Sequence, residues 1–196
     1  MTQTGRILAF KPPVVPLEER SDTALLDACA QGEQAALGVL YRRHAASVLH
    51  FCARLSSRQL SDLEDIVQEV FLVVWRSAAD FEHQSAVRSW LFGIAANLVR
   101  GGQRRDARRR DIDATRLHQL ETSTGGEAHY MSRQTMHKLN AALQNLPTEQ
   151  REAFVLCDVE GLGGKEAAMV LHVPDGTLYR RLFEARRALR SVLEGL

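Results

Sequence analysis

The chain has 196 residues, of which 45% are hydrophobic and 25% are charged, and its formal net charge at pH 7 is +1. This length suits one domain or two small ones, and the balanced total charge excludes a uniformly basic or acidic protein. No apolar run is long enough to span a membrane and no signal-peptide pattern opens the chain, so we expect a cytoplasmic protein without membrane insertion.

The spacing of the apolar residues predicts an all-α protein, because they recur three and four positions apart and rarely alternate with polar residues. Residues 1–20 are expected to form a flexible lead-in. A short helix is predicted to begin at Asp22 and to end near Gly32, and a second one to cover roughly residues 33–56. The apolar stripe of this second helix contains Leu37, Leu40, Tyr41, His44, Val48, Cys52 and Leu55.

The stretch "DLEDIVQEVFLVVWR", residues 62–76, is predicted to be a helix with one apolar face and one acidic face. Ser61 and Glu64 have the spacing of a capping box at its start. The apolar face contains Leu63, Ile66, Val67, Val70, Phe71 and Val74. The outward positions are Asp62, Asp65, Gln68 and Glu69. Such an acidic face, taken alone, is most simply solvated surface, so a function for it depends on the rest of the chain.

A further apolar helix is predicted in "SWLFGIAANLV", residues 89–99, and it completes a first domain that covers residues 21–106. Six arginines follow between residues 100 and 110. They are typical of a solvated basic segment, although beside a DNA-binding helix they could follow phosphates. The segment 107–131 lacks helical periodicity, and its stretch "ETSTGGEAHY" is typical of a flexible linker.

The second domain, residues 132–196, carries the pattern of a helix-turn-helix. Its stretch "LPTEQREAFVLCDVEG" is predicted to be a helix that Pro147 and Thr148 open and Gly161 closes. A short helix "GGKEAAMVL", a tight turn "HVPDG" and a longer helix "TLYRRLFEARRALR" follow. The buried side of this pair is expected to contain Leu171, Val173, Leu178, Leu182, Ala185 and Leu189. An arginine-rich second helix suits the major groove of DNA, where arginine can donate two hydrogen bonds to guanine.

These segments together resemble the extracytoplasmic-function (ECF) sigma factors, the small two-domain class of sigma-70-like bacterial sigma factors. "LLDACAQGEQAALGVLYRRHAASVLHFCARL" resembles the start of sigma region 2, and "DLEDIVQEVFLVVWR" resembles the polymerase-binding helix of the family. "FEHQSAVRSWLFGIAANLV" is similar to the segment that melts the promoter and recognises the −10 element. The stretch from Leu146 to Leu189 resembles region 4, which reads the −35 element. Each resemblance alone is weak, but all four in this order are specific.

The resemblance implies core RNA polymerase and promoter DNA as partners, with an anti-sigma factor as a further partner. The residues that it implies in polymerase docking, which share one side of a helix, are Asp65, Gln68, Glu69 and Leu72. The residues that it implies at the −10 DNA strand are Phe81, His83, Gln84, Ser85, Arg88 and Asn97. Trp90 and Phe92 are expected in the core rather than stacked on DNA, and Asn97 could instead brace a helix.

The residues that the resemblance implies at the −35 DNA are Lys165, Thr177, Tyr179, Arg180, Arg181, Phe183, Glu184 and Arg187. The chain also departs from the family pattern. Gly163 and Gly164 replace a serine and a larger residue at the start of the short helix, and Gly101 with Gly102 is expected to interrupt a helix that the family continues. Glu184 replaces an arginine or other polar residue, and it could accept a hydrogen bond from cytosine or repel phosphate.

The sequence offers no pattern for catalysis. It contains no Gly-rich phosphate loop, no nucleophile–base set and no metal-ligand spacing, and its cysteines, Cys29, Cys52 and Cys157, form neither a zinc nor a disulfide pattern. We therefore expect a protein that is not an enzyme and has no metal or cofactor. The leading interpretation is a sigma factor that binds core polymerase and directs promoter recognition, DNA melting and transcription initiation. The alternative is a helix-turn-helix repressor or activator that works without polymerase, which leaves the acidic helix without a role.

Overall fold

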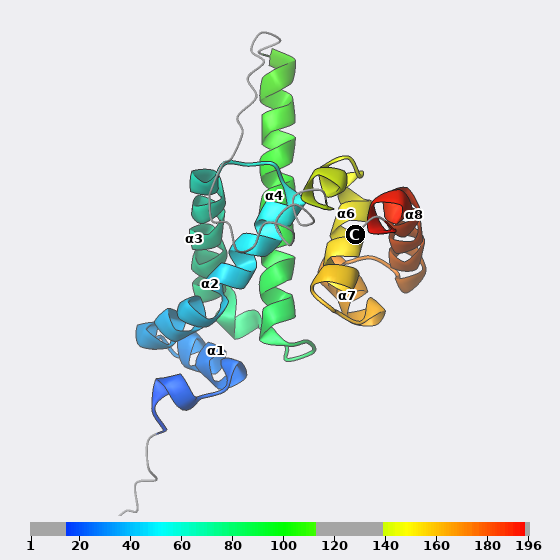
Figure 1. Cartoon of the computed structure of the whole chain (residues 1–196). Helices are drawn as coiled ribbons and strands as arrows, with labels where there is room; N and C mark the ends of the chain where they lie inside the picture. Colours follow the sequence, from blue (N-terminus) through cyan, green and yellow to red (C-terminus); the bar gives the residue numbers. More distant parts are fainter. Residues whose placement is uncertain (1–14, 113–138, 195–196) are drawn as a thin grey trace, which may run out of the picture.

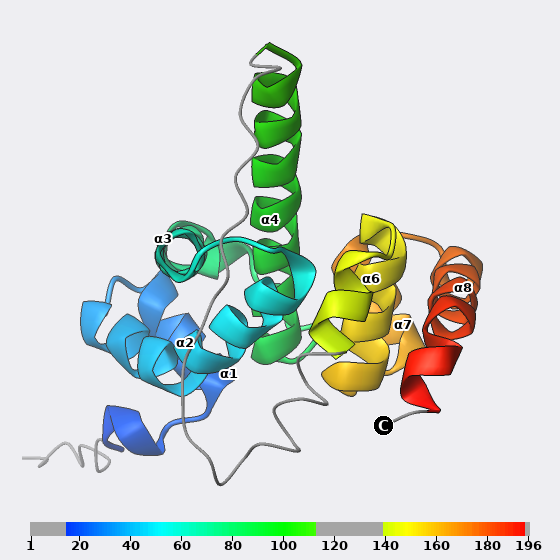
Figure 2. The same cartoon turned by 45° about the horizontal axis from the view of Figure 1, so that its top comes forward.

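The computed structural model describes residues 15–112 and 139–194, and every regular element within these two ranges is helical. The all-α prediction is therefore confirmed. Two groups of helices lie on opposite sides of the long helix α4 (Val87–Ile112), as Figures 1 and 2 show. The first group contains α1 (Asp22–Ala30), α2 (Gln34–Leu55) and α3 (Leu60–Ser77). The second group contains α6 (Thr148–Phe154), α7 (Gly164–Leu171) and α8 (Asp175–Leu193).

The apolar stripes predicted for α2 and α3 form most of the core of the first group. Their buried members include Leu40, Val48, Cys52, Leu55, Leu63, Val67, Val70, Phe71 and Val74. Tyr41 is the exposed exception, and its ring packs against Phe71 with the ring centroids 4.8 Å apart. No helix in the described residues is long and apolar enough to cross a membrane.

The capping box predicted at the start of α3 is wrong. The helix begins at Leu60, its N-cap residue is Gln59, and no side chain caps it. Because the helix starts two residues earlier than predicted, Ser61 lies inside the first turn. Its hydroxyl is therefore no longer at the position from which a cap accepts a hydrogen bond.

The interruption predicted at Gly101 and Gly102 is also wrong, because α4 continues through both residues to Ile112. A glycine in a helix interior costs only about 1 kcal/mol relative to alanine, so packing can compensate for it. Gly102 is buried, and a Cβ atom there would lie 2.6 Å from Nη2 of Arg58. The glycine thus leaves the space that the Arg58 guanidinium occupies. The C-terminal half of α4 extends beyond both helix groups (Figures 1 and 2).

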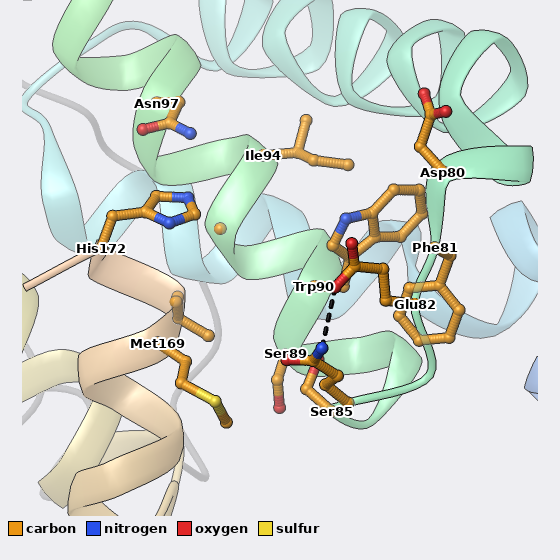
Figure 3. A pocket seen from close by; sticks show the side chains of 13 residues that line it. Asp80, Phe81, Glu82, Ser85, Ser89, Trp90, Ile94, Asn97, Met169 and His172 are labelled. Atoms are coloured by element: carbon orange, nitrogen blue, oxygen red, sulfur yellow. Dashed lines mark hydrogen bonds between the residues drawn. The ribbon is translucent and has the colours of Figure 1, made fainter.

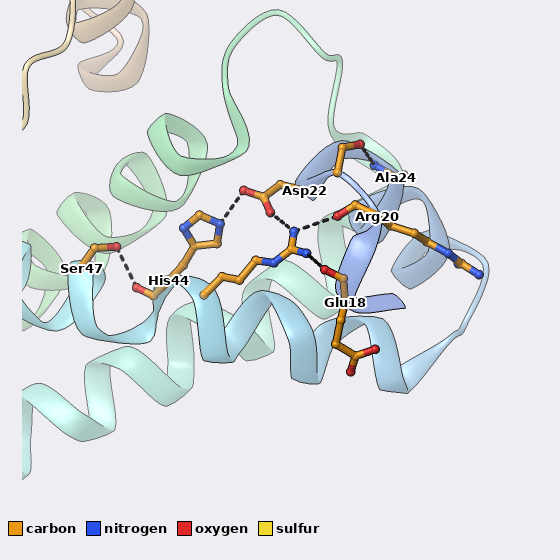
Figure 4. A network of polar contacts seen from close by, with 8 residues as sticks. Glu18, Arg20, Asp22, Ala24, His44 and Ser47 are labelled. Carbon is orange, nitrogen blue, oxygen red and sulfur yellow. Dashed lines mark hydrogen bonds and ion pairs between the residues drawn. The ribbon is translucent and has the colours of Figure 1, made fainter. Parts of the chain in front are cut away.

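A polar network fixes the segment before α1, part of which was predicted to be a flexible lead-in (Figure 4). Arg43 of α2 donates from Nη1 to the backbone oxygen of Arg20, at 2.9 Å, and to Oδ1 of Asp22, at 2.7 Å. Its Nη2 donates to the backbone oxygen of Glu18 at 2.6 Å. The second carboxylate oxygen of Asp22 lies 2.7 Å from Nε2 of His44. The short helix η1 (Leu17–Glu19) is therefore held against α2.

This network predicts a loss of stability in acid. Burial raises the pKa of Asp22, but hydrogen bonds from Arg43 and His44 outweigh burial, so its pKa lies below the ordinary value of 3.8. A lowered pKa in the folded state stabilises the fold above the pKa of the unfolded chain, and this contribution disappears as the pH falls through the lowered value. Urea unfolding from pH 7 to pH 2.5 should show Asp22→Asn less stable than the native chain at pH 7, with the difference shrinking in acid.

The exposed residue Asp62 provides the control for this experiment. The Asp62→Asn variant should follow the native chain at every pH. A stability difference between Asp22→Asn and the native chain that stays constant down to pH 2.5 would contradict the role assigned to the carboxylate.

The helix predicted from Pro147 to Gly161 is present, but its last turn is wider than an α-turn. After α6 the chain forms a π-helical turn, η4 (Val155–Val159), and the amide of Glu160 donates to the backbone oxygen of Val155 at 2.8 Å. Gly161 follows with φ = +75°, a backbone angle that glycine adopts without strain. Because this turn holds one residue more than an α-turn, Glu160 leaves the helix in a different direction from the one that an α-helix would give.

The helix-turn-helix is confirmed as α7 and α8. Between them His172 takes the left-handed conformation, with φ = +53°. The residues predicted for the shared buried side are buried, apart from the half-buried Val173; they are Leu171, Leu178, Leu182, Ala185 and Leu189. The arginines of α8 are therefore left on the surface away from this core.

Candidate docking and nucleic-acid surfaces

The acidic face of α3 is open to solvent. Asp65, Gln68, Glu69 and Leu72 are all exposed, while Val67 and Val70 of the same helix are buried. Only a weak contact engages the face in the described residues, an exposed pair in which Glu69 lies 3.9 Å from Arg76. The structure thus presents the four predicted docking residues together, with an apolar residue among the carboxylates.

The outer face of α8 is also open. Phe183 has 64% of its surface exposed, and Tyr179, Arg180 and Arg187 are exposed beside it. Thr177, Arg181 and Glu184 are half-buried, and Lys165 is exposed at the start of α7. The eight predicted −35 residues therefore lie on α8 and on the first turn of α7. An exposed phenylalanine on such a face suits the methyl group of thymine.

Gly164, which departs from the family pattern, makes room for Tyr179. A Cβ atom at Gly164 would lie 2.7 Å from Cζ of the Tyr179 ring, so any larger residue would displace that ring. Gly163 is the N-cap of α7, and no side chain caps this helix. The two glycines thus start the helix through backbone conformation alone and leave the tyrosine lying across its first turn.

Glu184 already has partners within the domain. Its Oε2 accepts a hydrogen bond from Nε2 of Gln150 at 2.9 Å, and its Oε1 accepts one from Nη1 of Arg180 at 3.3 Å. Neither contact was predicted from the sequence, although the four-residue spacing places Arg180 and Glu184 on the same side of α8. The Glu184 carboxylate therefore links Gln150 of α6 to Arg180 on the outer face of α8.

The loop between α3 and α4 forms one wall of a pocket of about 280 Å³ (Figure 3). Phe81 is buried in this wall, its ring centroid 5.2 Å from that of the half-buried Trp90. The facing wall contains Met169 of α7 and His172, the residue that follows α7, and Figure 3 shows both across from the loop. The pocket therefore lies between the two groups of helices.

The predicted −10 residues differ in how accessible they are. His83, Gln84 and Asn97 are exposed, whereas Ser85 and Arg88 are half-buried. His83 adopts φ = +56°, an uncommon angle for a residue with a side chain. Trp90 and Phe92 were predicted to lie in the core; Phe92 is fully buried, and Trp90 is half-buried and packs against the edge of the core.

Arg88 is engaged by the second helix group. Its guanidinium forms an ion pair with the Glu160 carboxylate through Nη2, and its Nη1 donates to the Glu160 backbone oxygen at 3.3 Å. Glu160 also pairs with Arg54 of α2 at 2.9 Å, and only 7% of its side chain is exposed. Nearby, Ser89 donates to Oε1 of Glu166 at 2.6 Å. Sequence reasoning missed this set, because no local pattern relates residues about 70 to 110 positions apart.

Two further polar contacts join the groups near α6. Glu152, with 1% of its side chain exposed, lies 2.8 Å from Nε of Arg100. Burial raises the pKa of Glu152 to about 7, although the positive charge of Arg100 acts against this. Arg151 is also buried, and its Nη1 donates to the backbone oxygen of Leu55 at 2.7 Å.

The described residues contain no cluster of three or more histidine, cysteine or acidic side chains that could hold a metal ion. Cys29 and Cys52 are buried and Cys157 is half-buried, and none of them is in a disulfide.

Comparisons with known proteins agree with the two helix groups. Residues 40–110 match the family Sigma-70 region 2, and residues 136–189 match the family Sigma-70, region 4. The ECF RNA polymerase sigma factor SigE of Mycolicibacterium smegmatis is 36% identical over 92% of this chain and 70% of its own length. SigM of Mycobacterium tuberculosis is 35% identical over 89% of this chain and 86% of its own.

A solved structure is similar across both helix groups. It is the sigma factor RpoE of Bartonella quintana in complex with the anti-sigma factor NepR. The two chains share 25% identity with a TM-score of 0.65, over 79% of this chain and 94% of the other.

Proposed function

The chain belongs to the ECF RNA polymerase sigma factors, and from this membership we propose which of its surfaces contacts each partner during transcription initiation. An ECF sigma factor directs RNA polymerase to promoters. In this chain the acidic face of α3 docks on core polymerase. The loop 81–88 and Asn97 hold the −10 strand, and α8 with Lys165 reads the −35 element.

One observation carries this proposal: a single chain exposes an acidic helical face in its first helix group and an arginine-rich recognition helix in its second. The acidic face suits basic side chains of a protein partner, where charge complementarity sets register and speeds association. The basic helix suits the phosphates and base edges of DNA. A polymerase-independent regulator would use the second surface alone, so it is not favoured.

The partners of this chain follow from the same proposal. Nucleotide addition is the work of the polymerase, so the chain itself supplies docking and DNA contacts and no catalytic residue. The similar sigma factor of Bartonella quintana is bound to an anti-sigma factor, and we propose that a protein of this class also binds the present chain.

Reversing two charges on α3 tests the docking role. The variant with Asp65→Arg and Glu69→Arg should bind core polymerase at least about tenfold more weakly, because like charges across an interface oppose association. Titration of core polymerase with fluorescently labelled protein measures this affinity, and promoter-directed transcription from genomic DNA should fall with it.

The control is Glu19→Arg, which reverses an exposed charge on the short helix η1, outside the acidic face of α3. This control should keep its affinity for core polymerase, and neither variant should bind duplex DNA more weakly than the native chain does. If the double variant binds core polymerase as tightly as the native chain does, the docking face lies elsewhere.

A further inference from the structure

The Tyr179 ring of α8 rests on the first turn of α7, at a position that has no side chain. A Cβ atom at Gly164 would lie 2.7 Å from Cζ and 2.8 Å from Cε1 of this ring, and it would also meet the hydroxyl oxygen. The family pattern has a larger residue at position 164, whose Cβ atom would take this space. The contact between the two helices therefore depends on the glycine.

The ring, and not the backbone, is the part that would yield to a side chain at position 164. Leu178, which precedes the tyrosine, is fully buried, and so is Ala167 of α7, so the core below holds both helix backbones in place. Tyr179 itself is 53% exposed. Two χ1 rotamers are common for a long side chain in a helix, so a ring that is excluded from one can move to the other. A side chain at position 164 should thus displace the ring at little cost to the fold.

The displaced ring would move toward the face of α8 that is proposed to read the −35 element. Tyr179, Phe183 and Arg187 follow one another at four-residue intervals, so they form one exposed row along the helix. Phe183 keeps 64% of its surface exposed while the Tyr179 ring lies on α7. Because α7 and the buried core bound the ring on its other sides, a ring released from α7 would enter the space in front of this row. Base edges occupy that space when a recognition helix lies in the major groove.

We propose that Gly164 determines specificity for the −35 element by positioning Tyr179. The glycine keeps the tyrosine ring against α7, at the edge of the exposed row, and so leaves Phe183 and Arg187 free to meet the bases. This inference rests on the proposed function, because it takes α8 as the helix that reads the −35 element. The ligand concerned is duplex DNA, and the role of Gly164 is to position another residue.

The test compares the same substitution at two neighbouring glycines of the full chain. Gly164→Ser places a side chain against the Tyr179 ring, whereas a Cβ atom at Gly163 meets nothing within 4 Å. Gly163→Ser is therefore the matched control, and it introduces serine at the N-cap of α7, where serine is favourable. A binding selection over duplexes with a randomised −35 segment gives the base preference of each chain.

Gly164→Ser should bind the duplex that the native chain prefers about tenfold more weakly, which is the size of effect expected for one lost base contact. It should also prefer a different base at one or more positions of the segment. Gly163→Ser should keep the native preference and bind the preferred duplex no more weakly than the native chain does. A native base preference in Gly164→Ser would overturn the proposal.

A Tyr179→Ala background shows whether Gly164 acts through the ring. In this background Gly164→Ser should change neither the affinity nor the base preference, because no ring is left to displace. Such non-additivity is the mark of two residues that act together. If Gly164→Ser has the same effect with and without the tyrosine ring, the effect comes from α7 itself and the proposal is wrong.

Fluorine NMR reports the position of the ring without DNA. The chain has three tyrosines, so fluorotyrosine labelling gives three resonances, and Tyr179→Phe identifies the one from Tyr179. This resonance should shift in Gly164→Ser and stay unchanged in Gly163→Ser. An identical resonance in the native chain and in both variants would contradict the contact between the ring and Gly164. If Gly164→Ser does not fold, Gly164→Ala introduces the same Cβ atom with a residue that favours the helix.

These measurements separate the inference from the function on which it rests. If the native chain shows no base preference in the −35 segment, the proposed reading role of α8 fails. The fluorine spectra would still report whether Gly164 positions the Tyr179 ring.

Discussion

Replacing Arg151 by methionine is expected to lower the free energy of unfolding by about 3–5 kcal/mol, because the guanidinium is buried and its loss leaves several buried acceptors unpaired. Its Nη1 donates to the backbone oxygen of Leu55 at 2.7 Å and to Oε1 of Gln144 at 2.8 Å. Its Nη2 donates to the backbone oxygens of Gln144 and Leu146, both at 2.9 Å. Methionine fills much of the volume but supplies none of these donors.

The measurement is chemical denaturation at pH 7, with Arg186→Met as the matched control. Arg186 also makes two hydrogen bonds, to the carboxylate of Asp158, but 55% of its side chain is exposed. Exposed pairs typically contribute no more than about 1 kcal/mol, so this control should change stability little. Equal losses for the two variants would contradict the role assigned to burial.

Arg180→Ala is expected to weaken binding to the preferred −35 site by about 1–3 kcal/mol and to relax preference at one base pair. The reason is that its guanidinium is exposed on the outer face of α8, where it can donate two hydrogen bonds to guanine. Arg190→Ala is the matched control on the same helix, since Arg190 is exposed but lies farther along it. If Arg190 meets only phosphate, its loss should weaken all sequences alike and reduce the salt slope by about one.

The Glu184→Ala variant distinguishes three roles of the Glu184 carboxylate, which are to orient Arg180, to read cytosine or to repel phosphate. The structure favours an orienting role, because Gln150 holds Glu184 while Glu184 accepts a hydrogen bond from Arg180. An orienting role predicts that Glu184→Ala relaxes the same base pair as Arg180→Ala, and that the double variant loses less than the sum of both. Reading cytosine predicts a different base pair, and repelling phosphate predicts tighter binding to all sequences.

A binding selection over duplexes with a randomised −35 segment separates these outcomes. The selection gives the base preference of each variant at every position of the segment. It therefore shows whether Glu184→Ala and Arg180→Ala relax the same base pair or different ones. If none of the substitutions alters affinity or preference, α8 is not the reading helix.

Local sequence patterns correctly predicted burial where the sides of a single helix determine which residues face the core. Leu63, Val67, Val70 and Val74 repeat every three or four residues, and all of them are buried as predicted. The same periodicity placed the acidic side of α3 and the outer face of α8 toward solvent, where Asp65, Gln68, Glu69, Leu72, Tyr179, Arg180, Phe183 and Arg187 are exposed.

Local patterns failed where a distant residue decides the structure. At Gly102 the Arg58 guanidinium, which comes from a segment more than 40 positions earlier, occupies the space that a side chain would fill. Glu184 is held by Gln150, and Arg88 is engaged by Glu160 from the other domain. No periodicity within one helix contains these relationships, so only the folded chain reveals them.

The π-helical turn before Glu160 has a consequence for chain length. An α-helix rotates by about 100° per residue, and a π-turn holds one residue more than an α-turn does. Val155–Val159 therefore behaves as if it carried a one-residue insertion. Deleting one residue from Val155–Val159 would tighten the turn and rotate Glu160 by about a quarter of a revolution, away from Arg54 and Arg88. This change would alter no side chain at the contact. The meeting of the two domains thus depends on the number of residues in this turn as well as on their identity.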